Sequence, residues 1–268
     1  MTPKRWLVLL LLMSVLIGLA GAVTGGGQDY RMFIVAAKTL LQGQSPYTIE
    51  GYYNPIYVAI AFIPFSLLPD AIGYPLFAGA SFFVLGLTFY KLTRNPIITA
   101  LLLATASALH IIWYGNIDAW VIAAAVVNPI AGVFMGLAKP QIGAVLGLFC
   151  LIRVWDRSRR GALFCALLVT VFYALSFSAG LWRTTPIDRA WNFSAWPIGL
   201  LIGIPVLILA WRDKSRRLAL GGMPLISPYL GGPDGYTGVL VAFARSTWAA
   251  IGCLIVSWIL LLIWRYRL

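Results

Sequence analysis

Residues 25–69 read GGGQDYRMFIVAAKTLLQGQSPYTIEGYYNPIYVAIAFIPFSLLP, the longest stretch that is neither uniformly apolar nor a simple loop. Asp29 follows three glycines and opens a run in which apolar residues recur at helical spacing, with Arg31 and Lys38 on another face. This pattern predicts an amphipathic helix lying along a membrane surface. By its position alone, Asp29 would be the N-cap of that helix.

A turn-rich loop follows this predicted helix. Gly43 is expected to end the helix, because glycine accepts the left-handed conformation common at a helix C-terminus. The next residues are rich in the types that favour tight turns, namely Ser45, Pro46, Gly51 and Pro55. The loop therefore presents a group of aromatic and amide side chains: Tyr47, Tyr52, Tyr53 and Asn54.

The composition of the 268 residues is that of a membrane protein. Hydrophobic residues make up 61% and charged residues 10% of the chain, and the mean hydropathy is +0.88. We therefore expect an all-α polytopic membrane protein with a single domain over residues 1–268. The net charge of +12 comes from short basic runs between apolar segments, at residues 4–5, 153–160, 212–217 and 265–267. This distribution indicates a cytoplasmic N-terminus by the positive-inside rule, and no nucleic-acid partner.

Residues 6–23 are long enough for a first transmembrane helix. A cleaved signal peptide is the alternative, because Ala20-Gly21-Ala22 resembles a small-residue cleavage site. The apolar run exceeds the core of an ordinary signal peptide, which favours a retained helix. Residues 24–55 are then the outer amphipathic helix and loop, and residues 56–264 contain the remaining membrane helices.

The later apolar segments differ in length. Residues 56–69 are too short to cross comfortably, whereas residues 71–90, 96–114 and 161–180 are expected to cross. Residues 119–138 are interrupted by Asn128-Pro129 and predict a hairpin that dips into the membrane. The remaining predicted segments are residues 140–152, a return helix before Arg212, and a last helix over residues 247–264. In the outer loop of residues 182–196, Asp188 lies between Arg183 and Arg189 and is expected to be ion-paired.

The cysteines and the single histidine give no metal signature. Cys150, Cys165 and Cys253 lie within apolar runs and lack C-x-x-C spacing, which is typical of small core residues. A zinc or haem site is not expected with one histidine in the chain.

The order of residues resembles the polyprenyl-phosphate-mannose-dependent mannosyltransferases of the GT-C superfamily, in a shortened form. Those enzymes place an Asp after the first membrane helix, then a surface helix, a G-x-x-P-Y turn, a Y-x-P-P start and a closing L-L-P. The matching residues are Asp29, Gly43, Pro46, Tyr47, Tyr53, Pro55 and Leu67-Leu68-Pro69. Ile56 departs from the pattern, since the family usually has a second proline there.

Two later segments extend the resemblance. Gly115-Asn116 and Lys139-Pro140-Gln141 bracket an apolar hairpin, as a G-Q/N and an L-K-P-Q segment do in the family, and the hairpin is short here. Residues 227–235 resemble a later outer turn that carries an Asp, here Asp234. The chain is also shorter than usual family members, which puts retained catalysis in question.

The resemblance implies transfer of a sugar, typically mannose, from a polyprenyl-phosphate donor to a glycolipid or glycan on the outer face of a plasma membrane. Asp29 would be the base that takes the acceptor proton, with cations stabilising the leaving phosphate. Arg31, Lys38 and Lys139 are the cation candidates. The other expected substrate-binding residues are Tyr47, Tyr53, Asn54, Asn116, Asp118, Gln141 and Asp234. A divalent metal ion occurs in some GT-C enzymes, and the one or two acids counted here do not establish one.

Two other functions remain open at this point. One is a non-catalytic, degenerate GT-C-like membrane subunit that binds lipid or scaffolds a larger complex with protein partners. The other is a transporter with a helix broken at Asn128-Pro129, which the absence of a visible paired repeat disfavours.

Overall fold

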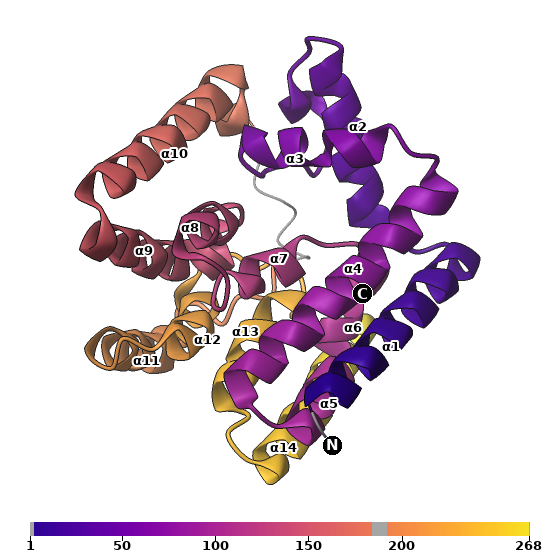
Figure 1. The fold of residues 1–268 in the computed structure, drawn as a ribbon, viewed down its shortest axis with the longest axis vertical. Coiled ribbons are helices and arrows are strands. Elements are labelled where there is room, and N and C mark those ends of the chain that lie inside the picture. Colours follow the sequence, from indigo (N-terminus) through magenta and orange to yellow (C-terminus); the bar gives the residue numbers. More distant parts are fainter. Residues whose placement is uncertain (1–2, 184–191, 268) are drawn as a thin grey trace.

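A computed structural model describes residues 3–183 and 192–267, and the secondary structure in these ranges is entirely helical (Figure 1). The α-helices are α1 Pro3–Thr24, α2 Gln28–Leu41, α3 Ile56–Ser66, α4 Asp70–Thr93, α5 Pro96–Leu103, α6 Ala106–Tyr114, α7 Asp118–Ala123, α8 Pro129–Leu137, α9 Pro140–Arg157, α10 Arg159–Ala179, α11 Leu200–Arg212, α12 Arg216–Ile226, α13 Thr237–Phe243 and α14 Thr247–Arg267. Short 3₁₀ turns include η1 Pro46–Thr48, η2 Leu181–Arg183 and η4 Pro233–Tyr236. The ion pair expected for Asp188 lies outside the described residues.

Three helices are long and apolar enough to cross a membrane, namely Lys4–Thr24, Asp70–Thr93 and Arg159–Ala179. They correspond to the spans predicted at residues 6–23, 71–90 and 161–180, and they indicate a membrane protein. Residues 56–69, which were expected to be too short to cross a membrane, form only the short helix α3 in the structure. α3 has 11 residues, or roughly 16 Å of helix, against about 30 Å of hydrocarbon.

The segment predicted to cross at residues 96–114 is broken in the structure. It is divided into α5 and α6, which together are long and apolar enough for one span and are bent by 60°. Thr105 caps α6, with its hydroxyl accepting from the amide of Ala108. α14 holds the break in place, because Ser257 accepts a hydrogen bond from the amide of Ala106 and Trp258 donates one to the carbonyl of Ala104. Side chains about 150 positions away thus satisfy the backbone groups that the bend frees.

The interruption predicted at Asn128-Pro129 is confirmed. α7 has six residues and α8 has nine, each far shorter than a membrane span. The Asn128 side chain accepts a hydrogen bond from the amide of Ile130 and caps α8, while Pro129 occupies the first helical position.

The amphipathic helix predicted after Asp29 is α2. It buries Tyr30, Phe33, Ile34, Ala36 and Ala37 and packs on α3. Gly43 follows its end with a φ of +73°, as the sequence predicted.

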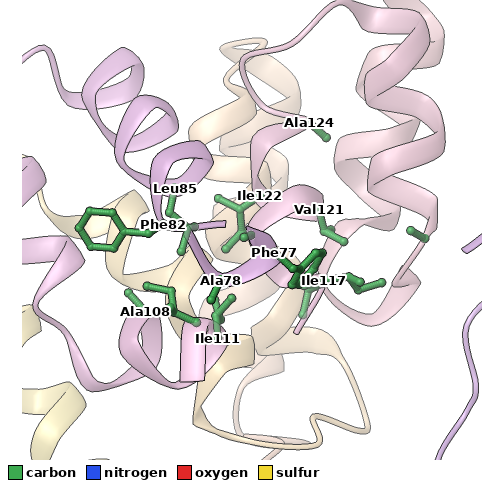
Figure 2. Packing of buried hydrophobic residues seen from close by; sticks show 14 of the residues in the cluster. Phe77, Ala78, Phe82, Leu85, Ala108, Ile111, Ile117, Val121, Ile122 and Ala124 are labelled. Carbon is green, nitrogen blue, oxygen red and sulfur yellow. The ribbon is translucent and has the colours of Figure 1, made fainter. Parts of the chain in front are cut away.

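The core is formed where α4, α6 and α7 meet (Figure 2). Phe77 and Leu85 of α4 pack there with Ile111 of α6 and Val121 of α7. α1 lies alongside α4 (Figure 1). The two helices approach closely at small residues, as membrane helices commonly do: a Cβ on Gly18 would lie 2.7 Å from the carbonyl oxygen of Pro75.

Candidate functional site

Two left-handed glycines bring the start of α2 to the end of α6. Gly27 precedes α2 with a φ of +89°, and its amide donates a 2.8 Å hydrogen bond to the carbonyl of Trp113. Gly115 ends α6 with a φ of +68°. Both conformations are strained for residues with a Cβ. They turn the chain so that Asp29 and Asn116 face each other.

Asn116 is the hub of a buried polar cluster. Its amide nitrogen donates to Asp29 Oδ2 at 2.8 Å and to Asp234 Oδ2 at 2.9 Å. Its amide oxygen accepts from Lys139 Nζ at 3.3 Å and from the backbone amide of Asp118 at 3.2 Å. One side chain therefore connects residues of α2, α7, the α8–α9 junction and η4. We call these five residues, Asp29, Asn116, Asp118, Lys139 and Asp234, the carboxylate–lysine cluster.

Lys139 supplies the positive charge of the cluster. Its Nζ lies 2.5 Å from Asp118 Oδ1 and 3.9 Å from Asp234 Oδ2. The side chain of Lys139 is 16% exposed and that of Asp118 is fully buried. Pro140 is the first residue of α9, so the lysine projects from a break between two helices. Charge-assisted bonds of this kind are strong, and their geometry fixes both partners.

The cluster holds three carboxylates and one ammonium group. Burial raises the pKa of Asp29 from its ordinary 3.8 to about 6, and the nearby Asp234 adds to the shift, against opposing effects of Lys139 and Asn116. Burial alone would lower the pKa of Lys139, but the surrounding carboxylates, Asp118 first, raise it overall. The lysine therefore stays charged, whereas Asp29 gains and loses its proton close to neutral pH.

One acceptor of the cluster is unused. Asp118 Oδ2 is buried and has no hydrogen-bond partner among the described residues. Such an atom is costly unless a proton, water or ligand reaches it.

An apolar cavity of about 310 Å³ lies beside the cluster. Aromatic side chains of α3, α4 and α7 line it, including Phe62, Phe65, Phe77 and Trp120. Its wall also includes Ile117 and Ala138, the residues immediately before Asp118 and Lys139. A hydrocarbon chain in this cavity would therefore end close to the charged groups.

The two other predicted phosphate ligands lie apart from this network. Arg31 and Lys38 are exposed on α2. Arg31 donates a 2.8 Å hydrogen bond to the carbonyl of Gly26, which stabilises the turn between α1 and α2. In the described part of the chain, neither side chain forms a hydrogen bond or an ion pair with a residue of the cluster.

Two of the loop residues predicted to bind substrate, Asn54 and Tyr47, support the backbone next to Lys139. Asn54 donates a 2.9 Å hydrogen bond to the carbonyl of Ala138, and Tyr47 donates one of 3.1 Å to the carbonyl of Asn54. Both side chains are thus engaged in holding the α8–α9 junction. Tyr53 is exposed, and Gln141 is half-buried in the first turn of α9.

His110 is a member of this region that the sequence did not single out as a site residue. Its Nδ1 lies 3.8 Å from Asp234 Oδ1, and its ring stacks on Tyr114 at a centroid distance of 4.1 Å. The spacing of four residues between His110 and Tyr114 puts both on one helix face, six and two residues before Asn116. That spacing is the signal that could have identified the pair.

The expectation that Asp29 caps α2 is wrong. The N-cap is Gly27, without a side-chain capping bond, and Asp29 lies within the first helical turn. Its carboxylate instead accepts from Asn116. An acid in the first turn still interacts favourably with the helix dipole.

The described residues contain no group of three or more His, Cys, Asp or Glu arranged to hold a metal ion. The Lys139 amine lies between Asp118 and Asp234, where a cation shared by those carboxylates would have to lie. The metal considered from the sequence therefore lacks a set of ligands in this arrangement.

Comparisons of the chain with protein-family models, with curated proteins and with solved structures found no match.

Proposed function

We propose that the chain is a membrane glycosyltransferase that moves a sugar from a polyprenyl-phosphate donor to a glycolipid or glycan. One observation carries the proposal. A carboxylate with a raised pKa and a charged lysine share a buried hub, Asn116, beside an apolar cavity. These are the groups that transfer from a lipid phosphate requires: a base, a cation and a place for hydrocarbon.

Asp29 is the base in this proposal. It accepts the proton of the acceptor hydroxyl while the acceptor oxygen forms a bond to the anomeric carbon of the sugar. The bond from that carbon to the phosphate oxygen breaks, and its electron pair leaves with the polyprenyl phosphate. A base works best when its pKa lies near the operating pH, and the pKa of Asp29, about 6, meets that requirement.

Lys139 stabilises the charge that develops on the leaving phosphate. Its pairing with Asp118 fixes the amine in advance, so little reorganisation is needed when charge develops. The surplus of carboxylates opposes an incoming phosphate. Donor binding is therefore expected to take up a proton.

The proposal places the cluster on the outer face of a plasma membrane, with a cytoplasmic N-terminus. The distribution of Lys and Arg supports this orientation. Single cysteines at the exposed positions Gln28 and Thr48 should react with an impermeant thiol reagent added outside cells. Cysteines at Arg157 and Arg212 should react only after permeabilisation, in a background with the three native cysteines replaced. The reverse pattern would overturn the orientation and the outer-face donor.

Sugar transfer is tested with the purified chain in lipid nanodiscs and a radiolabelled polyprenyl-phosphate-mannose donor. Asp29→Asn should lose about 100-fold or more in turnover, because the amide cannot accept the proton. Donor binding should persist in that variant. Glu50→Gln, which neutralises an exposed acid of the loop, is the matched control and should keep full turnover. Full activity of Asp29→Asn, or no transfer by the wild type to a panel of lipid and glycan acceptors, would contradict the proposal.

A non-catalytic lipid-binding subunit is the second candidate, and the pairing of Lys139 favours it. The positive charge of the lysine is already paired with Asp118 at 2.5 Å without a substrate. This alternative predicts donor binding in the apolar cavity with no turnover. Loss of binding in Trp120→Ala together with the absence of transfer in the wild type would identify it.

A further inference from the structure

A second charged region lies around the C-terminal end of α4. It is an open pocket of about 490 Å³. Six cationic side chains line it: Lys91, Arg94, Arg153, Lys214, Arg216 and Arg217. None of the described residues that line this pocket is acidic. We call it the basic pocket. The pocket shares no lining residue with the carboxylate–lysine cluster. Ala125 and Val126 of its wall follow the end of α7, the helix that begins at Asp118.

Two of the cations occupy strained backbone positions. Arg94 and Lys214 have φ values of +56° and +49°, and among the described residues they are the only non-glycine residues with positive φ. The left-handed conformation is unfavourable for any residue with a Cβ. Both residues lie at chain turns, after α4 and after α11, where glycine or asparagine would be less strained. Strain of this kind clusters at functional sites, and here it brings two charges to one pocket.

A third cation of the pocket, Arg216, has a buried nitrogen, Nη1, that forms no hydrogen bond within the described part of the chain. Burial and the neighbouring Arg153 lower the pKa of Arg216, as expected for cations gathered in a partly desolvated place. Arg217 differs, because its three nitrogens donate to the carbonyls of Leu92, Val241 and Ala244. Arg217 therefore has a structural role, because it links α12 to the ends of α4 and α13. The other cations of the pocket are the ones that could contact a ligand.

We propose that the basic pocket binds a phosphate-bearing anion, supplied by a membrane phospholipid headgroup or by a soluble polyphosphate. Arginine forks match phosphate oxygens, and a dense group of cations selects a multiply charged oxyanion over a single carboxylate. The pocket also includes Leu92, Ala125 and Val126, so one wall is apolar. A ligand there would neutralise the mutual repulsion of the cations and bond the free nitrogen of Arg216.

The test uses variants that remove charge without disturbing packing. Arg94→Asn and Lys214→Asn each delete a cation, and asparagine tolerates the left-handed conformation better than arginine or lysine. The double variant should therefore stay folded. Arg212→Gln is the matched control, because Arg212 is 72% exposed, pairs with Asp213 and does not line the pocket. Arg216→Gln is a third variant that removes the buried nitrogen.

Two binding measurements separate the ligand sources. Native mass spectrometry would count phosphatidylglycerol retained by the chain from micelles that also contain phosphatidylcholine. Titration with pyrophosphate in detergent would measure soluble anion binding. We expect wild-type binding in at least one measurement, and a loss of 10-fold or more in the double variant and in Arg216→Gln. Binding in neither measurement, or an equal loss in Arg212→Gln, would overturn the site. Failure here leaves sugar transfer by Asp29 untouched, and the reverse also holds.

Discussion

The carboxylate–lysine cluster and the basic pocket arrange their charged side chains in opposite ways. In the cluster, three acids and one lysine from four parts of the chain are paired through Asn116. In the basic pocket, six cations surround an open volume, and two of them hold strained backbone conformations. In the first region the fold itself pairs the lysine with carboxylates, whereas the cations of the second region require solvent or a ligand.

This difference determines what substitutions should do. Removing one partner from a compensated group leaves an unpaired buried charge, which is strongly destabilising. Removing a cation from a group of like charges relieves repulsion. The same kind of change, loss of one positive charge, should therefore shift stability in opposite directions in the carboxylate–lysine cluster and in the basic pocket.

The largest effect is expected for Lys139→Met. It leaves the buried Asp118 without its cation and should cost about 3–5 kcal/mol of unfolding free energy. Thermal unfolding in detergent micelles, followed by tryptophan fluorescence, would measure the loss. Lys139→Met combined with Asp118→Leu should recover part of it. Lys38→Met, at an exposed lysine, should change stability by less than about 0.5 kcal/mol. Equal effects at Lys139 and Lys38 would show that the cluster is not a stabilising ion network.

Gly27→Ala tests how the cluster is positioned. The substitution adds a left-handed penalty of roughly 1–2 kcal/mol. Its Cβ would also lie 2.6 Å from the Tyr74 ring, which adds about 1–3 kcal/mol of overpacking. Gly43→Ala is the matched control, since Gly43 has a similar φ of +73° but open space around its Cβ. If both variants lose the same stability in thermal unfolding, close packing at Tyr74 is not what holds Asp29 beside Asn116.

The pH dependence of stability tests the environment of Asp29. Its pKa is raised from 3.8 to about 6 in the folded chain, so the folded state binds the proton more tightly than the unfolded state. This contribution therefore increases stability as the pH falls through 6, and it is complete below 3.8. Between pH 7 and pH 5 the gain should be roughly 1 kcal/mol, allowing for partial exposure. Asp29→Asn should lose that part of the pH dependence. An unchanged dependence in the variant would show that another group, such as Asp118, whose pKa burial raises to about 7, is responsible.

The smallest effect is expected at the basic pocket and has the opposite sign. Arg94→Asn and Lys214→Asn should each stabilise the chain by about 0.5–1 kcal/mol in the absence of ligand, by relieving backbone strain and repulsion. Arg94→Ala removes the same charge but keeps an unfavourable left-handed residue, so it should gain less. At a saturating concentration of the anion, the wild type should become more stable than the variants, because the bound anion would stabilise the wild type most. Thermal unfolding with and without pyrophosphate or phosphatidylglycerol would measure both rankings.

Local patterns were enough to predict several helices and breaks. The periodicity after Asp29 predicted α2, and Asn128-Pro129 predicted the interruption between α7 and α8. Both depend on nearest neighbours, since capping and helical spacing act over three or four residues. The bend between α5 and α6 could not be predicted in that way. It is held by Ser257 and Trp258, whose contacts come from the other end of the chain.

The candidate site divides in the same manner. Motif order singled out Asp29, Asn116 and Lys139, but it also suggested Arg31 and Lys38, which the fold leaves exposed. A helix face can be predicted from spacing, whereas the neighbour that this face meets depends on packing. The position of His110 beside Asp234 illustrates the limit, because 124 residues separate them.

By itself, the sequence determined that this chain is apolar, helical and basic between its apolar segments, because composition and periodicity act through the backbone and the solvent. Only the tertiary structure decided which charges meet. Asn116 joins two acids and a lysine from distant segments, while six other cations collect around one pocket. The physical reason is that pairing and repulsion between side chains depend on distances of a few ångströms, and packing alone sets those distances.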